Sequence, residues 1–370
     1  AQALQNAAAK PLVNILADGG NHTGLGSIGH WDLRGRPGTI HLSDASFFHD
    51  QTKPLKGGLL VIPGFTAWSH TSLAIDGGLA GFPDGFVIDI PGDLTISGSG
   101  GGLMASNPLI NVAGDYRDTA VEGHSLIADP AGGIMNVAGS LLVSGYGERR
   151  LAASTVQGQV FSFKTGIIVT NGATMGLRST VVEGIRPGPA ATLASGGGLT
   201  VAANARLLPR ALCTTITNAI PFLIKARDIH VLAGGTVASD ATGFPGGDLP
   251  KGITSGYGPG GGKQYGGGGY GGRGGYGGGD AYGAEQYKTP LLPGSGGGTW
   301  NNGNGDYGGT GGGVVWLEAE RRLLVDGTVS ANGASMANYS GGGAGGSVYL
   351  RGAYFDGGGI IRANGGNGRT

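Results

Sequence analysis

Short runs of alternating apolar and polar residues recur along the chain. Residues 87–100 read VIDIPGDLTISGSG, residues 134–147 read IMNVAGSLLVSGYG, and residues 160–173 read VFSFKTGIIVTNGA. A period of two indicates a strand with one buried face. Each unit holds two such runs, which are separated by a small or polar break and followed by a glycine-rich turn. The first two units align without gaps at a shift of 47 residues, and the third follows after 26 more.

Looser copies follow at 199–208, 222–233, 314–333 and 348–366, and TVSANG at 328–333 aligns with IIRANG at 360–365. Short strands that turn at glycine and asparagine corners can stack, so that equivalent positions share one face. The sequence therefore predicts an all-β fold, a parallel β-helix (β-solenoid) with glycine-rich loop insertions. A β-sandwich or propeller is the alternative, but it would show evenly spaced hairpin turns.

This pattern divides the chain into four parts. Residues 1–58 are expected to form an N-terminal segment with the first coils or a cap, and 59–251 to form solenoid coils. Residues 252–313 are expected to be a glycine- and tyrosine-rich insertion, and 314–370 the C-terminal coils. Residues 1–10 (AQALQNAAAK) are the best helix candidate. The predicted apolar column comprises Ile88, Ile90, Leu94, Ile96, Val137, Leu141, Val143, Phe163, Ile167 and Val169, and Trp316 is expected to lie in the core.

Composition narrows the classes of protein. Glycine supplies 83 of 370 residues, yet 39% of the chain is hydrophobic and the formal net charge is zero. A disordered chain would be less hydrophobic and more charged, and a nucleic-acid binder would carry a basic excess. No apolar run reaches the roughly 20 residues of a membrane helix, so no membrane insertion is expected. The single cysteine, Cys213, excludes an intrachain disulfide framework.

The stretch 308–368 carries a cadence of Gly-Gly-Gly, a strand, Leu-x-Val-x-Gly and Ala-Asn-Gly. It resembles the glycine-rich repeats of large secreted β-helix exoproteins, which are surface and adhesin-like proteins. The resemblance implies a β-helix and a secreted, extracellular or cell-surface location. The start Ala1-Gln2-Ala3 also fits a site left by signal-peptide cleavage. The repeats carry packing positions and imply no activity.

Residues 252–313 contain 29 glycines in 62 positions and seven tyrosines. The segment is expected to be a long loop or a set of packed glycine-rich coils. Tyrosines spaced by glycine provide flat contact area with a polar tip, which suits a neighbouring subunit or a glycan. RNA binding is disfavoured although 271–275 reads GGRGG, because the segment holds few basic residues. The predicted assembly contacts are Tyr257, Tyr265, Tyr270, Tyr276 and Tyr282, together with Ile360, Ile361 and Arg362 of the last unit.

Motifs for chemistry are weak. The GxGxxG match at 256–261 lies in a glycine tract with no strand before it and no helix after it, and no two histidines have the spacing of a metal-ligand pair. Asp115, Arg117 and Asp118, followed by Arg149 and Arg150, could serve a polysaccharide lyase or hydrolase, but a solvated turn is the favoured interpretation. We therefore expect no enzyme activity, cofactor or metal. Asn21 and Asn338 begin possible N-glycosylation sequons.

The expected function is structural: a secreted subunit that assembles with itself, head to tail, into an extracellular filament, sheath or surface layer. Low charge favours association, and the strand at 360–363 is expected to offer an unpaired edge. A cell-surface adhesin or glycan-binding module is the first alternative, which requires exposed aromatic residues in a row. A polysaccharide-degrading enzyme is the second.

Overall fold

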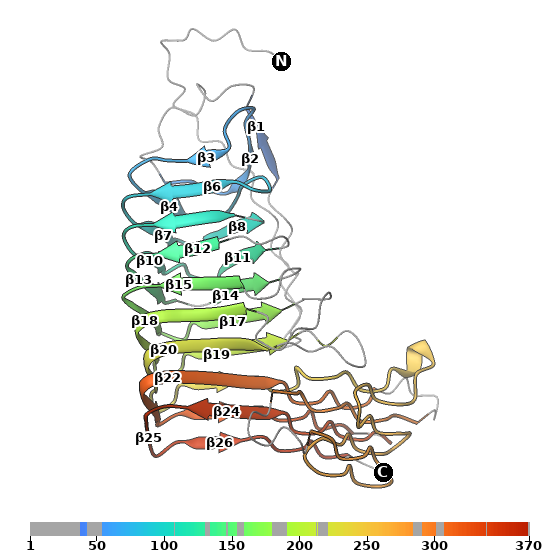
Figure 1. Ribbon diagram of the computed structural model, residues 1–370. Coiled ribbons are helices and arrows are strands. Elements are labelled where there is room, and N and C mark those ends of the chain that lie inside the picture. Colours follow the sequence, from blue (N-terminus) through green and yellow to red (C-terminus); the bar gives the residue numbers. More distant parts are fainter. Residues whose placement is uncertain are drawn as a thin grey trace, which may run out of the picture.

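The computed structural model describes residues 38–42, 54–106, 108–129, 134–145, 147–153, 159–179, 191–211, 213, 221–283, 291–300, 307–337 and 339–368. These residues form an all-β structure whose strands lie in successive layers along one axis (Figure 1). No α-helix occurs among them, and one 3-10 turn, η2, spans Leu249–Lys251. The helix candidate at 1–10 lies outside the described residues.

The strands are short except where two faces of a layer are joined in one strand, as in β18, β20 and β22. Their bounds are β1 Thr39–His41, β2 Gly58–Val61, β3 Ala67–Trp68, β4 Leu73–Asp76, β5 Leu79–Gly81, β6 Val87–Ile90, β7 Leu94–Ser97, β8 Gly102–Ser106, β9 Leu109–Val112, β10 Tyr116–Asp118, β11 Gly123–Asp129, β12 Ile134–Val137, β13 Ser140–Val143, β14 Gly147–Ala153, β15 Gln159–Phe163, β16 Gly166–Val169, β17 Thr174–Ser179, β18 Ala191–Val201, β19 Arg206–Ala211, β20 Phe222–Val231, β21 Thr236–Ala238, β22 Val314–Val325, β23 Thr328–Ser330, β24 Ser347–Arg351, β25 Tyr354–Asp356 and β26 Ile360–Arg362.

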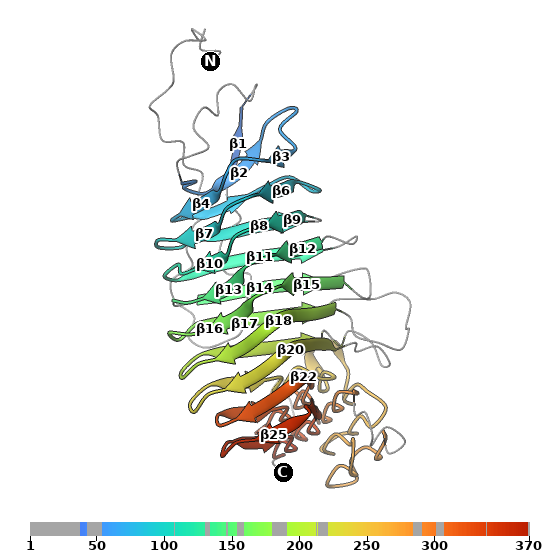
Figure 2. The same ribbon diagram turned by 60° about the vertical axis from the view of Figure 1, so that its left-hand side comes forward.

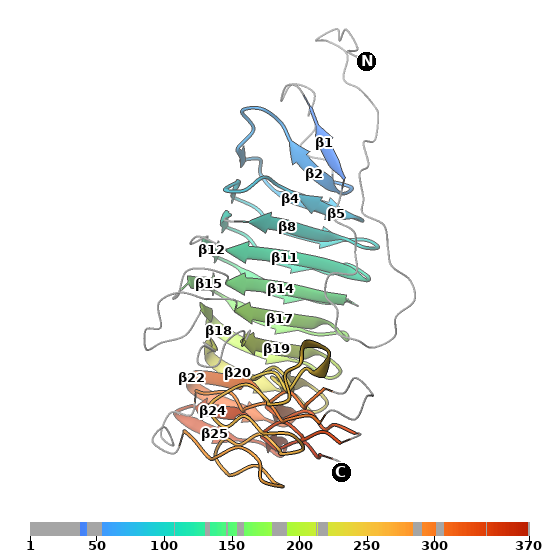
Figure 3. The ribbon, with the colours of Figure 1, turned by 90° about the vertical axis from the view of Figure 1, so that its right-hand side faces the viewer.

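Each strand pairs in parallel with the equivalent strand of the next layer. One sheet runs in the order β1-β2-β5-β8-β11-β14-β17-β19-β21-β23-β26. The second sheet has two branches, β3-β6-β9-β12-β15 and β4-β7-β10-β13-β16, which meet at β18 and continue through β20 and β22 to β24 and β25. The two branches and the first sheet form three walls around one core. Figure 3 shows the wall formed by the first sheet, with β5, β8, β11, β14, β17 and β19 facing the viewer.

The alternation read from the sequence places the core. Ile88 and Ile90 of β6 and Leu94 and Ile96 of β7 point inward and are buried, while Asp89 between them is exposed. All ten residues of the predicted apolar column are buried and belong to one hydrophobic cluster. Burial of each such side chain contributes about 1.5–3 kcal/mol, so the column is the main source of stability.

The strand register confirms the alignment at a shift of 26 residues, and it shows that the shift of 47 residues relates strands that are not neighbours. The shift of 26 is a single layer, because Val143 pairs with Val169. The shift of 47 spans two layers, since β10 lies between β7 and β13. Its Asp118 pairs with Ile96 on one side and Val143 on the other, so an aspartate occupies a core position. That polar residue is why the apolar pattern did not reveal this layer.

The corner between the two branches of the second sheet requires glycine. A Cβ on Gly92, Gly114 or Gly139 would lie 2.1–2.4 Å from an oxygen atom of the preceding layer. Aspartates complete the same corner: the carboxylate of Asp93 accepts the Asp115 N–H at 2.8 Å, and the carboxylate of Asp115 accepts the Ser140 N–H at 2.8 Å. The break of a small residue, glycine and a polar residue at 91–93, 113–115 and 138–140 therefore allows these layers to stack.

Glycine-rich segments pack beside the last layers into what we call the glycine-rich body: residues 243–283, 291–300, 307–313, 331–337, 339–346 and 363–368 (Figures 1 and 2). Backbone hydrogen bonds join its segments at every third residue. The N–H groups of Gly294 and Gly297 donate to Gly312 and Gly309, each at 2.8 Å. Three residues per turn is the repeat of a polyproline II helix, which makes no internal hydrogen bonds.

The central segments of this body form a closed set. Segment 294–297 donates backbone hydrogen bonds to segment 309–312, as described above. Segment 309–312 in turn donates to segment 341–344, and segment 341–344 donates back to segment 295–298. Residues 293–299 are buried, and four of the seven are glycines. Backbone groups therefore satisfy one another where water is excluded. This body replaces the long loop that one interpretation of the sequence anticipated.

Trp316 is not in the core, contrary to the sequence-based expectation. It points outward from β22 and is only partly buried. Its indole N–H donates to the Glu318 carboxylate at 3.0 Å, and its ring meets Tyr349 of the next layer edge to face at 6.3 Å. The adjacent Val315 and Leu317 take the inward positions.

The close packing of the body gives a direct test. A Cβ on Gly297 would lie 2.1 Å from the Gly341 carbonyl oxygen, whereas a Cβ on Gly272 would meet nothing within 4 Å. We expect Gly297→Ala to lower the free energy of unfolding by about 1–3 kcal/mol through overpacking. Gly272→Ala, the matched control, should leave it unchanged or slightly raised. Chemical denaturation measures both, and equal stabilities would contradict the packing described.

Candidate functional site

Exposed aromatic rings gather at the end of the glycine-rich body, where its segments reverse direction. The ring of Tyr265 is the centre of the group: it stacks on Trp300 at 5.1 Å and meets Tyr276 at 6.0 Å and Tyr339 at 6.2 Å. The other three rings are exposed, Tyr276 by 73%, Tyr339 by 49% and Trp300 by 37%. We call these four residues the aromatic head.

The backbone of the body positions these rings. Gln264, Tyr276 and Tyr339 have positive φ angles of 50°, 56° and 53°, which occur at tight reversals. Trp300 directly follows the buried segment 293–299. A bridge between Thr299 and Ser340, whose hydroxyl groups lie 3.1 Å apart, brings Trp300 beside Tyr339. A rigid backbone framework therefore supports an apolar surface with polar tips.

Tyr270 and Tyr282, two predicted contact residues, lie inside the body. Their rings meet at 4.9 Å, and the Tyr270 hydroxyl lies 2.6 Å from the Ser347 hydroxyl. The Tyr282 hydroxyl donates to the Pro293 carbonyl and accepts from Ser295 at 3.1 Å. Burial raises the pKa of both phenols above the ordinary value. Both side chains hold the body together, and Tyr257 is also partly buried there.

Ile360, Ile361 and Arg362 form β26, the last layer described, and all three are exposed. Ile361 pairs with the buried Val329, and Phe355 of β25 pairs with the buried Leu323. Both side chains therefore continue the core column. They are nevertheless exposed by 45% and 53%, because no described residue covers them.

The acidic and basic residues proposed as a possible catalytic cluster separate into two groups. Asp115 and Arg117 are partly exposed at a corner, where the Arg117 guanidinium lies 2.6 Å from the Asp115 carboxylate and 3.9 Å from that of Asp93. The hydrogen bonds from Ser140 and Arg117 hold the pKa of Asp115 below its ordinary value. This pair supports stacking of the corner, in agreement with the solvated-turn interpretation.

Asp118 and Arg149 do not follow that interpretation, because both are buried in the core. The Arg149 guanidinium lies 2.6 Å from the Asp118 carboxylate, and the two side chains are exposed by only 5% and 0%. The Ser125 hydroxyl donates to Asp118 at 2.7 Å, and Arg149 also donates to the Ala120 carbonyl at 2.7 Å. Burial raises the pKa of the Asp118 carboxyl, while Arg149 and Ser125 stabilise its ionised form.

This network spans neighbouring layers. Ser125 and Arg149 pair directly across β11 and β14, and Asp118 lies on β10. A buried ion pair of this kind contributes little net stability but is costly to break. The sequence showed the charges but could not show that they face inward, because only the register with Ile96 and Val143 reveals it.

The remaining sequence-based candidates concern glycosylation, metal binding and membrane insertion. Asn21 and Asn338 lie outside the described residues. Within the described ranges, no group of His, Cys, Asp and Glu side chains could hold a metal ion, and no helix could span a bilayer. Trp300 and Tyr339 were missed as site residues. Each is separated by one residue from a run of three glycines, the one signal that could have identified them.

Comparison with protein-family models, with curated proteins and with solved structures finds no match for this chain.

The buried pair generates a second prediction. We expect Arg149→Met to cost about 3–5 kcal/mol of stability near neutral pH, since it leaves the Asp118 carboxylate buried without its partner. Arg117→Met, which breaks the exposed pair with Asp115, should cost less than about 1 kcal/mol. Chemical denaturation of the two variants measures the difference.

The pH dependence of stability also tests whether the Asp118 carboxylate is buried beside Arg149. The folded-state pKa of Asp118 is raised, so the protonated carboxyl is favoured by folding and stability is lost as pH rises through that pKa. Part of the loss in Arg149→Met should therefore be recovered on acidification. Equal losses in the two arginine variants at every pH would contradict the buried network.

Proposed function

We propose that the chain is a parallel β-helix that carries the glycine-rich body as a rigid side structure, and that it acts as a secreted or cell-surface glycan-binding module. The stacked parallel layers support the first part. The aromatic head is the observation that supports the second. Binding of sugar rings uses flat aromatic surfaces with polar groups at their edges, and Tyr and Trp provide both.

The geometry of the head fits recognition better than it fits a packing role. Its rings come from separate segments that are fixed by backbone hydrogen bonds, so little side-chain order has to be gained on binding. Exposed aromatic groups of this size are uncommon on a protein surface without a partner. The partly buried pair Tyr270 and Tyr282 shows how the same residue type is satisfied when it serves packing.

Self-assembly into a filament or surface layer is the second candidate, and the last layer described supports it. Phe355, Ile360 and Ile361 are more than two-fifths exposed and lie on strands with open edges. Such an edge pairs readily with another chain. A second copy stacked on this layer would cover both the apolar side chains and the backbone groups.

The glycan proposal predicts the effect of removing the central stack. Trp300→Ala and Tyr265→Ala should each weaken binding to the best ligand of an immobilised glycan panel by about tenfold or more. Tyr354→Ala removes a ring that is 51% exposed on β25, away from the head, and serves as the matched control. Undiminished binding in both head variants, with unfolding curves like those of the wild type, would refute the proposal.

The assembly proposal predicts a concentration-dependent increase in sedimentation coefficient that persists at high salt, because the contact is apolar. Ile361→Asp should abolish the increase by placing a charge on the contact. Ile168→Asp is the control, since Ile168 is 43% exposed on the outer side of β16. A wild-type chain that remains monomeric at every concentration would exclude assembly through this layer.

A further inference from the structure

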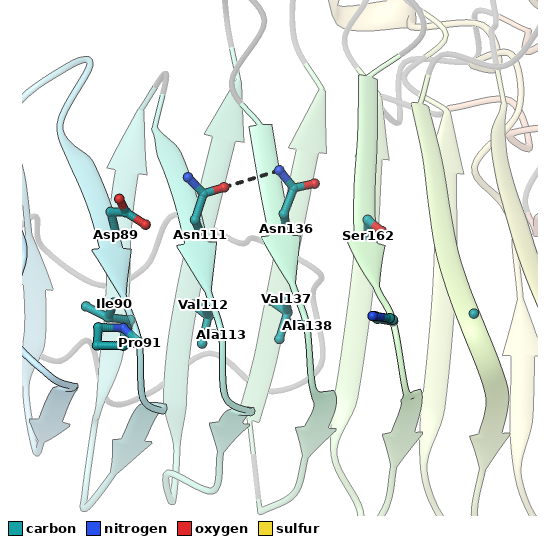
Figure 4. A pocket seen from close by; sticks show the side chains of 12 residues that line it. Asp89, Ile90, Pro91, Asn111, Val112, Ala113, Asn136, Val137, Ala138 and Ser162 are labelled. Atoms are coloured by element: carbon teal, nitrogen blue, oxygen red, sulfur yellow. Dashed lines mark hydrogen bonds between the residues drawn. The ribbon is translucent and has the colours of Figure 1, made fainter.

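The outer wall formed by β6, β9, β12, β15 and β18 carries a ladder of polar side chains in register. Asp89 pairs with Asn111, Asn111 with Asn136, and Asn136 with Ser162. All four lie in one row that points away from the core (Figure 4). Parallel strands set a repeat of about 4.8 Å along this row.

Apolar groups flank the polar row on both sides. Two residues earlier on the strands are Val87, Leu109 and Val160, and the latter two are exposed by 38% and 44%. On the other side, the strands end at small corner residues, Pro91, Ala113 and Ala138. Together with the polar row, these corner residues line a groove of about 720 Å³ (Figure 4).

The groove is chemically neutral along its middle. Asn136 donates to the Asn111 carbonyl oxygen at 3.2 Å. An amide carries two N–H groups and a carbonyl oxygen with two acceptor sites, so this one bond leaves capacity to bind hydroxyl groups of a ligand. The charged residues stand at opposite ends, with Asp89 in the first layer of the groove and Lys164 near the last.

We propose that this groove binds a linear, neutral polysaccharide that runs along the ladder, one layer for each sugar unit or nearly so. Sugar rings combine equatorial hydroxyl groups with apolar C–H faces, and the groove offers amides between apolar rows in the same arrangement. A repeating ligand suits a repeating site, since each additional layer adds an equivalent contact. The middle of the groove offers no cation to pair with the carboxylates of a polyuronate, and Asp89 would repel them; Lys164 could pair with a carboxylate only near the last layer.

The apolar row continues beyond the groove and extends the site. In register after Val160 come Thr192, Leu223, Trp316 and Tyr349. Trp316 and Tyr349 are outward-facing and partly exposed, and the sequence had assigned Trp316 to the core. The apolar row therefore runs from β6 to β24, separate from the aromatic head, but the row beside it becomes charged after the groove, at Lys225, Glu318 and Arg351. Only the layers of the groove offer an uncharged polar row.

Calorimetric titration with three hexasaccharides tests the proposal: β-1,4-linked glucose, β-1,4-linked N-acetylglucosamine and α-1,4-linked galacturonic acid. We expect at least one neutral oligomer to bind and the charged one to bind more weakly. The variant Asn111→Ala/Asn136→Ala should weaken that binding about tenfold or more, because two hydrogen-bonding groups are lost. Thr95→Ala/Thr200→Ala removes two outward-facing hydroxyl groups from the adjacent wall and should bind as the wild type does.

The head variant Trp300→Ala separates this site from the proposed function. Loss of hexasaccharide binding in the asparagine variant but not in Trp300→Ala supports the groove whatever the role of the head. Loss in Trp300→Ala alone overturns the groove and leaves the head as the glycan site. Absence of binding by all three oligomers also overturns it. A lower sedimentation coefficient in the asparagine variant than in the wild type would also overturn the proposal, because this wall would then be a contact with a second copy of the chain.

Discussion

The structure depends on the close approach of backbone to backbone. In the layers, parallel strands repeat at about 4.8 Å, so every side chain stands directly above its equivalent in the layer before. Any residue type that suits one layer must therefore suit a column. In the glycine-rich body, neighbouring segments leave no room for a side chain, because a Cβ at most glycine positions would overlap a backbone carbonyl group. The large glycine content follows from this constraint rather than from flexibility.

The same constraint explains how a polar residue is accommodated in the core. Asp118 stands in a column with Ile96 and Val143, where an unpaired carboxylate would be prohibitive. Arg149, from the layer that follows, provides the opposite charge, and Ser125 provides a hydroxyl donor. The network specifies one register, since a slip of β14 by a single residue would turn Arg149 to the other face and leave Asp118 without its partner. We regard register, rather than net stability, as its physical role.

Sequence reasoning predicted the features that repeat and missed those that do not. The alternation of Ile88, Ile90, Leu94 and Ile96 predicted an inward face correctly, because period two is a local property of a strand. The layer that contains Asp118 was missed, because its partner Arg149 is remote in sequence. Trp316 was assigned to the core on pattern alone, although its immediate neighbours Val315 and Leu317 take the inward positions. Tyr265 and Trp300 meet only through the folding of the body, which no local pattern encodes.

Repetition and its interruption have different consequences for binding. A column of equivalent positions, such as Asp89, Asn111, Asn136 and Ser162, presents polar groups at a regular spacing, and it therefore suits an extended ligand that repeats as well. The aromatic head is made where the repeat ends and the chain reverses, so that its four rings have four different surroundings. Such a site can recognise an individual end group or branch. If both proposals hold, one molecule would contact a polymer along its length and at a distinct point, and the rigidity of the glycine-rich body would set the distance between the two contacts.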